Sequence, residues 1–256
     1  MDLFFRKTGK GKTLVILHGV FGMSDNWATI GKALGEHFTV YMVDQRNHGR
    51  SGHSASMNYE AMSDDLLGFL EKENLEKPNL LGHSMGGKTI MQFAFDYPEK
   101  VEKMIVADIS PGASNHNHHH QKLIDALLSI DLEKYSSRNE VSQVLREKTG
   151  NARIRQFLLK NLYWKDRSSL GWRVNLEVIR DSLPEIFREV NGLQPFEGPT
   201  LFLKGEKSDY ITREDIPEIE ALFPNSQIRE IKKGTHWLHA DNPGDFIKEV
   251  KNFLLS

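Results

Sequence analysis

A serine flanked by glycines offers the clearest chemistry in the sequence. The apolar run 79–81 leads into Gly82-His83-Ser84-Met85-Gly86-Gly87, and a helical pattern follows. A strand, a sharp turn and a helix in this order are typical of a nucleophile elbow, which holds a serine hydroxyl free above a sheet. Gly82 and Gly86 let neighbouring backbone pass close to the turn, because glycine has no Cβ. The motif predicts that Ser84 is a nucleophile.

A serine hydroxyl is a weak nucleophile unless a base takes its proton, and the base needs a carboxylate that fixes its tautomer. In chains that carry this elbow, the histidine lies after the last strand. His236 has this position, and His239 competes with it three residues later. We expect His236 to be the base, because a histidine in the turn that leaves a strand reaches over the top of the sheet.

Two aspartates compete for the role of the acid. Asp108 ends the predicted strand 104–109, at the carboxyl edge where open α/β sheets bind ligands. Asp209 follows the predicted strand 200–204, but the usual Gly-x-x-Asp spacing places Ser208 where that acid is expected. A shift of one position along the chain turns a side chain away from its target. We favour Asp108 and keep Asp209 as the alternative.

Backbone amides are the predicted source of oxyanion stabilisation, since attack on an acyl carbonyl places negative charge on its oxygen. One donor is the amide of Met85, directly after the nucleophile. The other is expected from the glycine-punctuated loop 18–22, as the amide of Val20, or that of Phe21 if the loop is shifted.

Histidine and aromatic side chains are the candidates for contact with a substrate. Aromatic residues at helical spacing also serve as core, so those of the segment 113–195 have this second interpretation. Trp237 is the stronger candidate, because it adjoins the predicted base. The residues expected to line the substrate site are His18, Gly19, His83, Phe157, Trp164 and Trp237.

A patch of histidines, His116 and His118 to His120, suggests a metal at first sight. It lacks the carboxylates that accompany the histidines of a known site type. We therefore expect no metal, and we interpret the patch as a solvated loop at the mouth of the site. Its role stays open.

Short apolar runs separated by helical patterns position these residues. Continuous apolar runs of this kind are typical of parallel strands covered on both faces. Strands are expected at 2–7, 13–17, 38–43, 79–81, 104–109, 200–204 and 227–231, and a helix that begins after a capping Asn58 at 59–73. Alternating strands and helices with short links predict an α/β fold with a mostly parallel sheet and helices on both faces.

The alternation stops between residues 113 and 195. The patterns there are helical, at 123–130, 140–148, 154–162 and 176–190, with a break at Pro184. Because strands resume afterwards, we predict an all-helical cap insertion at 113–195. It interrupts one core domain made of residues 1–112 and 196–256.

Composition excludes several classes of function. The 256 residues fit one large domain, and the formal charge of −2 predicts neither a nucleic-acid partner nor an anionic membrane. Cysteine is absent, which removes thiol catalysis and cysteine-based metal sites. No signal peptide or membrane-spanning run is present, so a cytoplasmic monomer or homodimer is the expectation.

The sequence resembles the α/β-hydrolase superfamily over essentially its whole length. Within it, the chain is similar to the YbfF-type carboxylesterases, whose relatives include a mitochondrial abhydrolase-domain esterase. The segments that carry the resemblance are 18–22, 44–49, 82–88, 108–111, 156–160 and 236–240.

The resemblance implies hydrolysis of carboxylic esters and of acyl thioesters beneath a helical cap, without a cofactor. It implies that Asp108 serves the histidine, that Ser208 joins their hydrogen-bond network, and that Trp237 flanks the acyl chain. The chain departs from the family pattern in two places. Asp209 stands next to Ser208 and remains a second candidate for the acid, and the histidine patch is not part of the pattern.

We therefore predict a serine hydrolase for short to medium acyl esters, with a small-molecule ester or thioester as its only partner. C–C bond hydrolysis and acyl transfer use the same triad and remain alternatives. A ligand receptor with a slow vestigial triad is an alternative from another class. Fold alone does not decide the natural substrate, the acyl chain length or the preference for oxygen or sulfur esters.

Overall fold

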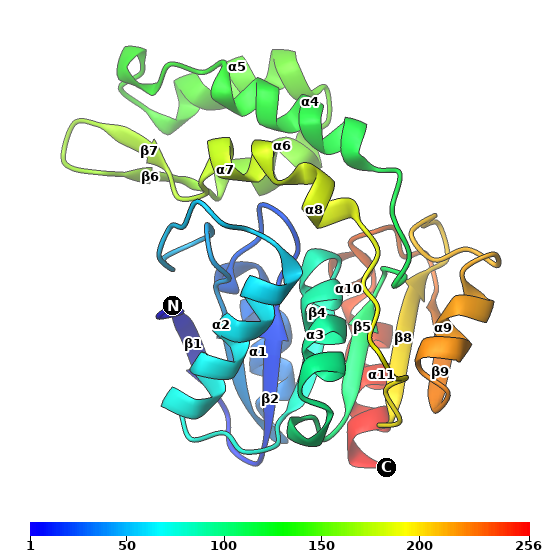
Figure 1. Cartoon of the computed structure of the whole chain (residues 1–256). Coiled ribbons are helices and arrows are strands. Elements are labelled where there is room, and N and C mark those ends of the chain that lie inside the picture. Colours follow the sequence, from blue (N-terminus) through cyan, green and yellow to red (C-terminus); the bar gives the residue numbers. More distant parts are fainter.

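A seven-stranded sheet forms the centre of the computed structural model, which describes residues 1–256 (Figure 1). Only β1 runs antiparallel to its neighbour, and the other pairs are parallel. In spatial order the strands are β1 (Phe5–Thr8), β3 (Phe38–Val43), β2 (Lys12–Leu17), β4 (Asn79–His83), β5 (Met104–Ala107), β8 (Thr200–Gly205) and β9 (Ser226–Ile231). The predicted mostly parallel α/β sheet is confirmed.

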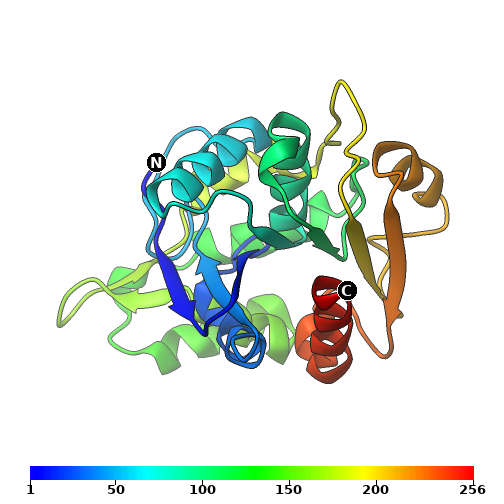
Figure 2. The ribbon, with the colours of Figure 1, turned by 90° about the horizontal axis from the view of Figure 1, so that it is seen from below.

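Helices cover both faces of the sheet (Figure 2), and alternate residues of the central strands face opposite layers. In β2, Leu14 and Ile16 belong to the apolar cluster beneath α1 (Ala28–Leu34) and α11 (Pro243–Leu255). Val15 and Leu17 belong to the cluster on the opposite face. All four side chains are at most 1% exposed. The continuous apolar runs in the sequence therefore reflect burial on both faces.

The opposite face is covered by α2 (Tyr59–Lys72), α3 (Met85–Asp96) and α9 (Ile216–Leu222). Asn58 caps α2 as expected, since its side chain accepts from the amide of Ala61 at 2.9 Å. The short helix α10 (Leu238–Asp241) precedes α11. None of the helices is long and apolar enough to cross a membrane.

The segment between β5 and β8 lies above the carboxyl ends of the parallel strands (Figure 1). We propose residues 113–195 as the cap, and 1–112 with 196–256 as the core domain. The elements of the cap are α4 (Asn117–Leu128), α5 (Arg138–Thr149), α6 (Ala152–Leu159), β6 (Leu162–Trp164), β7 (Leu170–Trp172), α7 (Leu176–Asp181) and α8 (Leu183–Phe187).

The prediction of an all-helical cap is wrong, because β6 and β7 form an antiparallel hairpin. Aromatic and branched side chains favour strands, and a polar turn joins these two short runs. The carboxylate of Asp166 accepts from the amides of Ser168 and Ser169, both at 2.8 Å, which closes the turn. The sequence signal was present, but each strand has only three residues.

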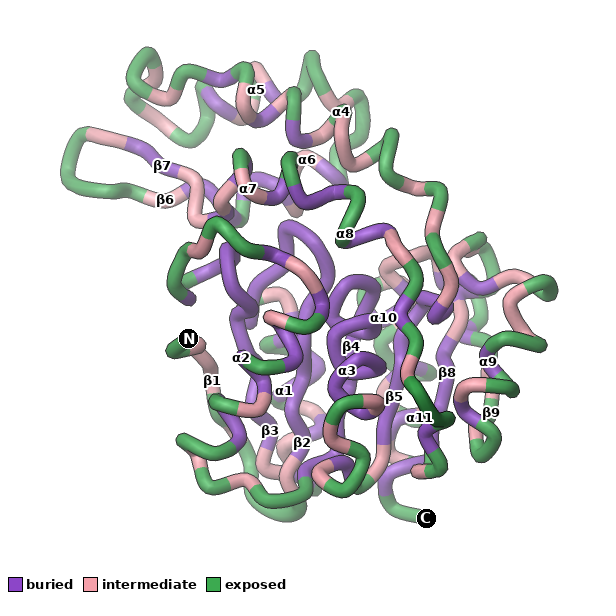
Figure 3. The backbone as a smooth tube through the Cα atoms, viewed as in Figure 1, coloured by how far each residue is buried: buried purple, intermediate pink, exposed green.

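The cap packs on the core and shares its apolar cluster. Buried positions occur in the cap helices as well as in the core (Figure 3). Tyr59 of α2 donates to the carbonyl of Ile186 at 2.5 Å, and Asn161 donates to the carbonyl of Phe21 at 2.8 Å. Buried Lys88 donates to the carbonyl of Gly112, where the chain enters the cap, at 2.6 Å. These bonds fix the cap over the edge of the sheet.

Candidate active site

Ser84 occupies a strained turn between β4 and α3. Its backbone angles are φ 53° and ψ −121°, a conformation that costs energy for any residue with a Cβ. A Cβ on Gly82 would collide with the carbonyl of Gly86, and one on Gly86 would collide with the carbonyl of Leu17. Both glycines of the motif are therefore required by the close packing of the turn, as an elbow demands.

A chain of hydrogen bonds connects Ser84 to His236 and Asp108. His236 lies in the loop between β9 and α10, and its Nε2 is 3.0 Å from Ser84 Oγ. Its Nδ1 is 2.8 Å from Asp108 Oδ2. The structure thus brings together three residues that are far apart in the sequence, in the geometry of a nucleophile, a base and an orienting acid.

Asp108 is fully buried directly after β5. Its carboxylate accepts from the amide of Gly205 at 2.7 Å and from the hydroxyl of Ser208. Burial raises the pKa of Asp108 to about 6, and these two hydrogen bonds oppose the shift because they favour the charged form. Asp108 is therefore ionised at neutral pH.

Asp209 does not contact His236. Its side chain is 79% exposed, and its Oδ1 lies 3.6 Å from Nε2 of His116 in the cap. The hydroxyl of Ser208, one residue earlier, points instead to Asp108. The single-residue shift relative to the usual spacing therefore turns the rival carboxylate toward the surface.

The loop after β2 contains the two candidate oxyanion donors, the amides of Val20 and Phe21, and their hydrogen bonds distinguish them. The amide of Phe21 donates to Nε2 of His48 at 3.1 Å, so it is already used. No protein group accepts from the amide of Val20, and Met85 is the first residue of α3, where amides lack partners within the helix. The free donors are those of Val20 and Met85.

Two buried histidines hold this loop. The amide of Gln45 donates to Nε2 of His18 at 3.0 Å, so Nδ1 of His18 carries the proton toward the carbonyl of Gly19. His48 is arranged in the same way, with its Nδ1 2.9 Å from the carbonyl of Arg46. Burial lowers the pKa of His18 to about 4 and that of His48 to about 3, so both stay neutral acceptors. The support that residues 44–49 give to the loop 18–22 was not predicted from the residues themselves.

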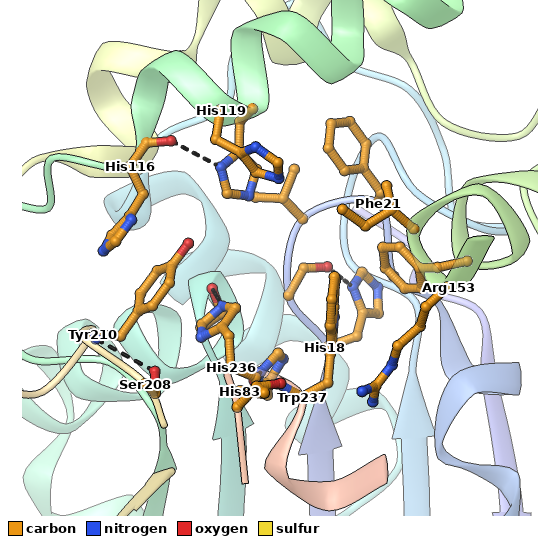
Figure 4. A pocket seen from close by; sticks show the side chains of 18 of the residues that line it. His18, Phe21, His83, His116, His119, Arg153, Ser208, Tyr210, His236 and Trp237 are labelled. Carbon is orange, nitrogen blue, oxygen red and sulfur yellow. Dashed lines mark hydrogen bonds between the residues drawn. The ribbon is translucent and has the colours of Figure 1, made fainter. Parts of the chain in front are cut away.

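A cavity of about 430 Å³ opens above the triad (Figure 4). His18, Gly19, His83, Phe157 and Trp237 all line it, as expected. The rings of Phe157 and Trp237 lie 5.9 Å apart, so they form an apolar wall made of one cap residue and one core residue.

Trp164 does not line the cavity, and its prediction as a substrate-binding residue is wrong. It lies on β6 in the cap hairpin and is 43% exposed. Burial falls along β6 from Leu162 to Trp164, because Trp164 ends the strand next to the exposed turn. The segment 113–195 was expected to be helical throughout, so the exposed end of a strand was not expected here.

The histidine patch is not a solvated loop. His116 precedes the first turn of α4, and the next histidines lie within that helix. His116, His119 and His120 line the cavity. His120 stacks on Phe21 with its ring centroid 6.0 Å away, and burial lowers its pKa to about 4. No group of three or more His, Asp or Glu side chains is arranged to hold a metal ion.

Tyr210 lies between two histidine rings, which the sequence did not suggest (Figure 4). Its ring centroid is 3.5 Å from that of His236, with 13° between the planes, and 3.8 Å from that of His116, with 12°. Burial lowers the pKa of His236, and the charges of His120 and His116 lower it further when they are protonated. The imidazole of His236 is therefore neutral, and the stacked ring of Tyr210 fixes the orientation of its plane.

Two more residues support the loop of the base. Nε2 of His83 lies 2.7 Å from the carbonyl of His236, so it can donate to it. His239 stacks on Trp27 with ring centroids 4.4 Å apart, and it does not reach Ser84. His83 therefore contacts both the cavity and the base, while the competing histidine is part of an aromatic cluster.

Comparison with known proteins agrees with this geometry. The sequence matches the alpha/beta hydrolase fold family over residues 12–243. The chain belongs to the α/β-hydrolase family. It is 40% identical to an sn-1-specific diacylglycerol lipase of Danio rerio, over 99% of this chain and 81% of that protein. Esterase YbfF of Escherichia coli is 29% identical, over 94% of this chain and 92% of that one.

A solved structure described as a marine microorganism esterase is also similar. It is 45% identical, has a TM-score of 0.96, and covers 98% of this chain and 99% of its own. The resemblance to YbfF-type esterases is confirmed, and this α/β-hydrolase is an enzyme of the esterase and lipase type.

Proposed function

We propose that this α/β-hydrolase cleaves carboxylic esters, and acyl thioesters, through an acyl-enzyme on Ser84. The observation that carries the proposal is the continuous hydrogen-bonded chain from Ser84 through His236 to Asp108 at the base of the cavity. A serine placed in this way has both an activating base and access to a ligand.

In the first step, Ser84 Oγ attacks the acyl carbonyl carbon while Nε2 of His236 takes the hydroxyl proton. Asp108 accepts from Nδ1–H throughout and stabilises the imidazolium that forms. Burial lowers the pKa of His236, so the imidazole is neutral before the attack, and the carboxylate of Asp108 compensates the charge that it gains with the proton.

The tetrahedral oxyanion then accepts hydrogen bonds from the amides of Val20 and Met85. It collapses as His236 returns its proton to the leaving alcohol or thiol, which gives the acyl-enzyme. Water attacks the acyl group by the same route, with His236 again as the base, and releases the acid and free Ser84.

The acyl group is expected to lie against Phe157 and Trp237, the apolar wall of the cavity. A volume of about 430 Å³ favours short to medium chains, since the leaving group must share the same space. The relative named a diacylglycerol lipase makes acylglycerols a natural class to include.

The test is steady-state hydrolysis of p-nitrophenyl esters from acetyl to palmitoyl, beside acyl-CoA thioesters of the same chains and a dispersed diacylglycerol. We expect turnover that Ser84→Ala abolishes, with Ser129→Ala, an exposed serine of the cap, as the matched control. Full activity in Ser84→Ala would refute the proposal. A single acylation event without turnover would favour the receptor alternative.

A further inference from the structure

Positive charge is concentrated in one part of the cap. Residues 146–173, called here the basic segment, contain two acidic residues and eight Lys or Arg residues, a formal charge of +6. Since the whole chain carries −2, the remaining residues carry −8. The eight are Arg146, Lys148, Arg153, Arg155, Lys160, Lys165, Arg167 and Arg173. The balanced total charge therefore conceals a separation of charge.

These charges are accessible and largely unpaired. Six of the eight side chains are exposed, and Arg155 and Arg173 are partly exposed. Only Arg153 has a carboxylate within ion-pairing distance, that of Asp241. Outside the segment, ten of the other 25 Lys and Arg residues have such a partner, as Arg229 has in Glu249. The basic segment thus offers unneutralised charge to a partner.

The β6–β7 hairpin adds an exposed tryptophan to these cations. Trp164 is 43% exposed, and exposed Lys165 and Arg167 follow it in the turn. Arg138 fixes the base of the hairpin by donating to the carbonyls of Leu159, at 2.7 Å, and Leu162. The hairpin extends sideways from the cap, and its tip is exposed (Figures 1 and 3).

The basic segment also adjoins the cavity of Ser84. Asn151, Arg153 and Phe157 belong to the segment and line the cavity. The guanidinium of Arg153 lies 5.1 Å from the ring centre of Trp237, next to the base. The amino-terminal part of the segment therefore lies beside the substrate site, and the hairpin continues from it away from the cavity (Figure 1).

We propose that the basic segment docks the enzyme on an anionic lipid bilayer, with Lys165 and Arg167 at the headgroups and Trp164 in the interface. Tryptophan beside cations is the composition of segments that bind membrane surfaces. A projecting hairpin tip with an exposed tryptophan suits the apolar interface of a bilayer better than the charged surface of an acidic protein. The −8 charge of the remaining residues turns the rest of the molecule away from the lipid.

Docking would present bilayer-embedded esters to the cavity, and this consequence alone rests on the proposed function. The test of docking therefore uses Ser84→Ala protein, which cannot consume the lipid. Its sedimentation is measured with vesicles of phosphatidylcholine and phosphatidylglycerol in a two-to-one ratio, and with vesicles of phosphatidylcholine alone. We expect binding only to the anionic vesicles, weakened by added NaCl.

In that background, Lys165→Gln with Arg167→Gln should lower the binding constant about 30-fold, because each cation contributes about fivefold at an anionic surface. The matched control is Lys10→Gln with Lys12→Gln, two exposed cations at the amino end of β2, one in the turn after β1 and one at the first residue of β2. This control should retain binding.

Equal binding by the two double variants, equal binding to neutral vesicles, or no binding at all would overturn the proposal. Binding of an acidic acyl carrier protein without vesicle binding would replace the lipid by a protein partner. In the catalytically competent chain, Lys165→Gln with Arg167→Gln should leave hydrolysis of soluble p-nitrophenyl butyrate unchanged. Vesicle binding without any hydrolysis would refute the proposed function and leave docking intact.

Discussion

The carboxyl edge of the sheet and the cap hold their side chains in different ways. At the sheet edge, Ser84 and Asp108 are buried and have strained backbones, with φ of 53° and 54°. In the cap, short amphipathic elements leave many side chains exposed, and Trp164 and Lys165 face solvent. We therefore propose that the edge fixes the geometry of bond breaking, whereas the cap selects the molecules that reach it.

If this division is correct, substitutions at the sheet edge should have the largest effects on kcat. Asp108→Asn should lower kcat about 10⁴-fold, because it removes the carboxylate that orients His236. Asp209→Asn should change kcat less than about threefold, since its carboxylate is exposed and faces the cap. Steady-state kinetics with circular dichroism as a folding control checks both. The reverse ranking would move the acid to the loop after β8.

Acid should destabilise the fold through the buried histidines of the sheet edge. Burial lowers the pKa of His18 to about 4, and those of His48 and His83 to about 3. These values lie below the ordinary 6.5, so the unfolded chain takes up protons first. Stability is present above pH 6.5 and is lost as the pH falls toward 4, by up to about 1.4 kcal/mol per pH unit for each histidine.

Thermal unfolding between pH 8 and pH 4 measures this loss. His118→Gln, at an exposed position of α4, should leave the pH profile unchanged. A melting temperature that stays constant from pH 7 to pH 5 would contradict the neutral, buried state of these rings.

Tyr210 links the two regions, and its replacement should have an intermediate effect. Tyr210→Leu should lower kcat about tenfold, because the ring that stacks on His236 is lost. Water would then reach the imidazole, so its pKa should rise and the acid limb of kcat/KM should move to higher pH. Tyr210→Phe keeps the stack and should restore both. Equal defects in the two variants would contradict a role for the ring.

The smallest effects belong to the cap. Phe157→Ala should raise KM for p-nitrophenyl hexanoate about fivefold with little change in kcat, because it removes apolar contact with the acyl chain. Trp164→Ala should leave KM for this soluble ester unchanged, since Trp164 lies outside the cavity. A larger effect from Trp164 would place the substrate against the hairpin.

The same difference between the sheet edge and the cap explains which features could be predicted from the sequence. Apolar runs such as 13–17 identify parallel strands because both faces are buried, and the turn geometry of Ser84 follows from its glycines. Asp108 was preferred over Asp209 by spacing, and the structure places only Asp108 at the base. Patterns that report burial and turn geometry are visible in a single sequence.

The cap was predicted less well because its determinants are contacts between distant residues. The three-residue strands β6 and β7 are too short for a periodic signal. His120 of α4 stacks on Phe21, and His116 just before α4 stacks on Tyr210, and both partners lie far away in the sequence. The total charge of −2 also gave no sign of the basic segment. A sum over the whole chain conceals a local excess of one sign, which appears only when the charges are counted segment by segment.

The central claim is that Ser84 carries the acyl group during turnover. The most direct measurement is rapid acid quench of the enzyme with p-nitrophenyl butyrate, followed by mass spectrometry of the peptides. We predict one butyryl group on Ser84, and none in Ser84→Ala or after the substrate is exhausted. Turnover without any adduct on Ser84, or an adduct on another residue that turns over at the catalytic rate, would contradict the account.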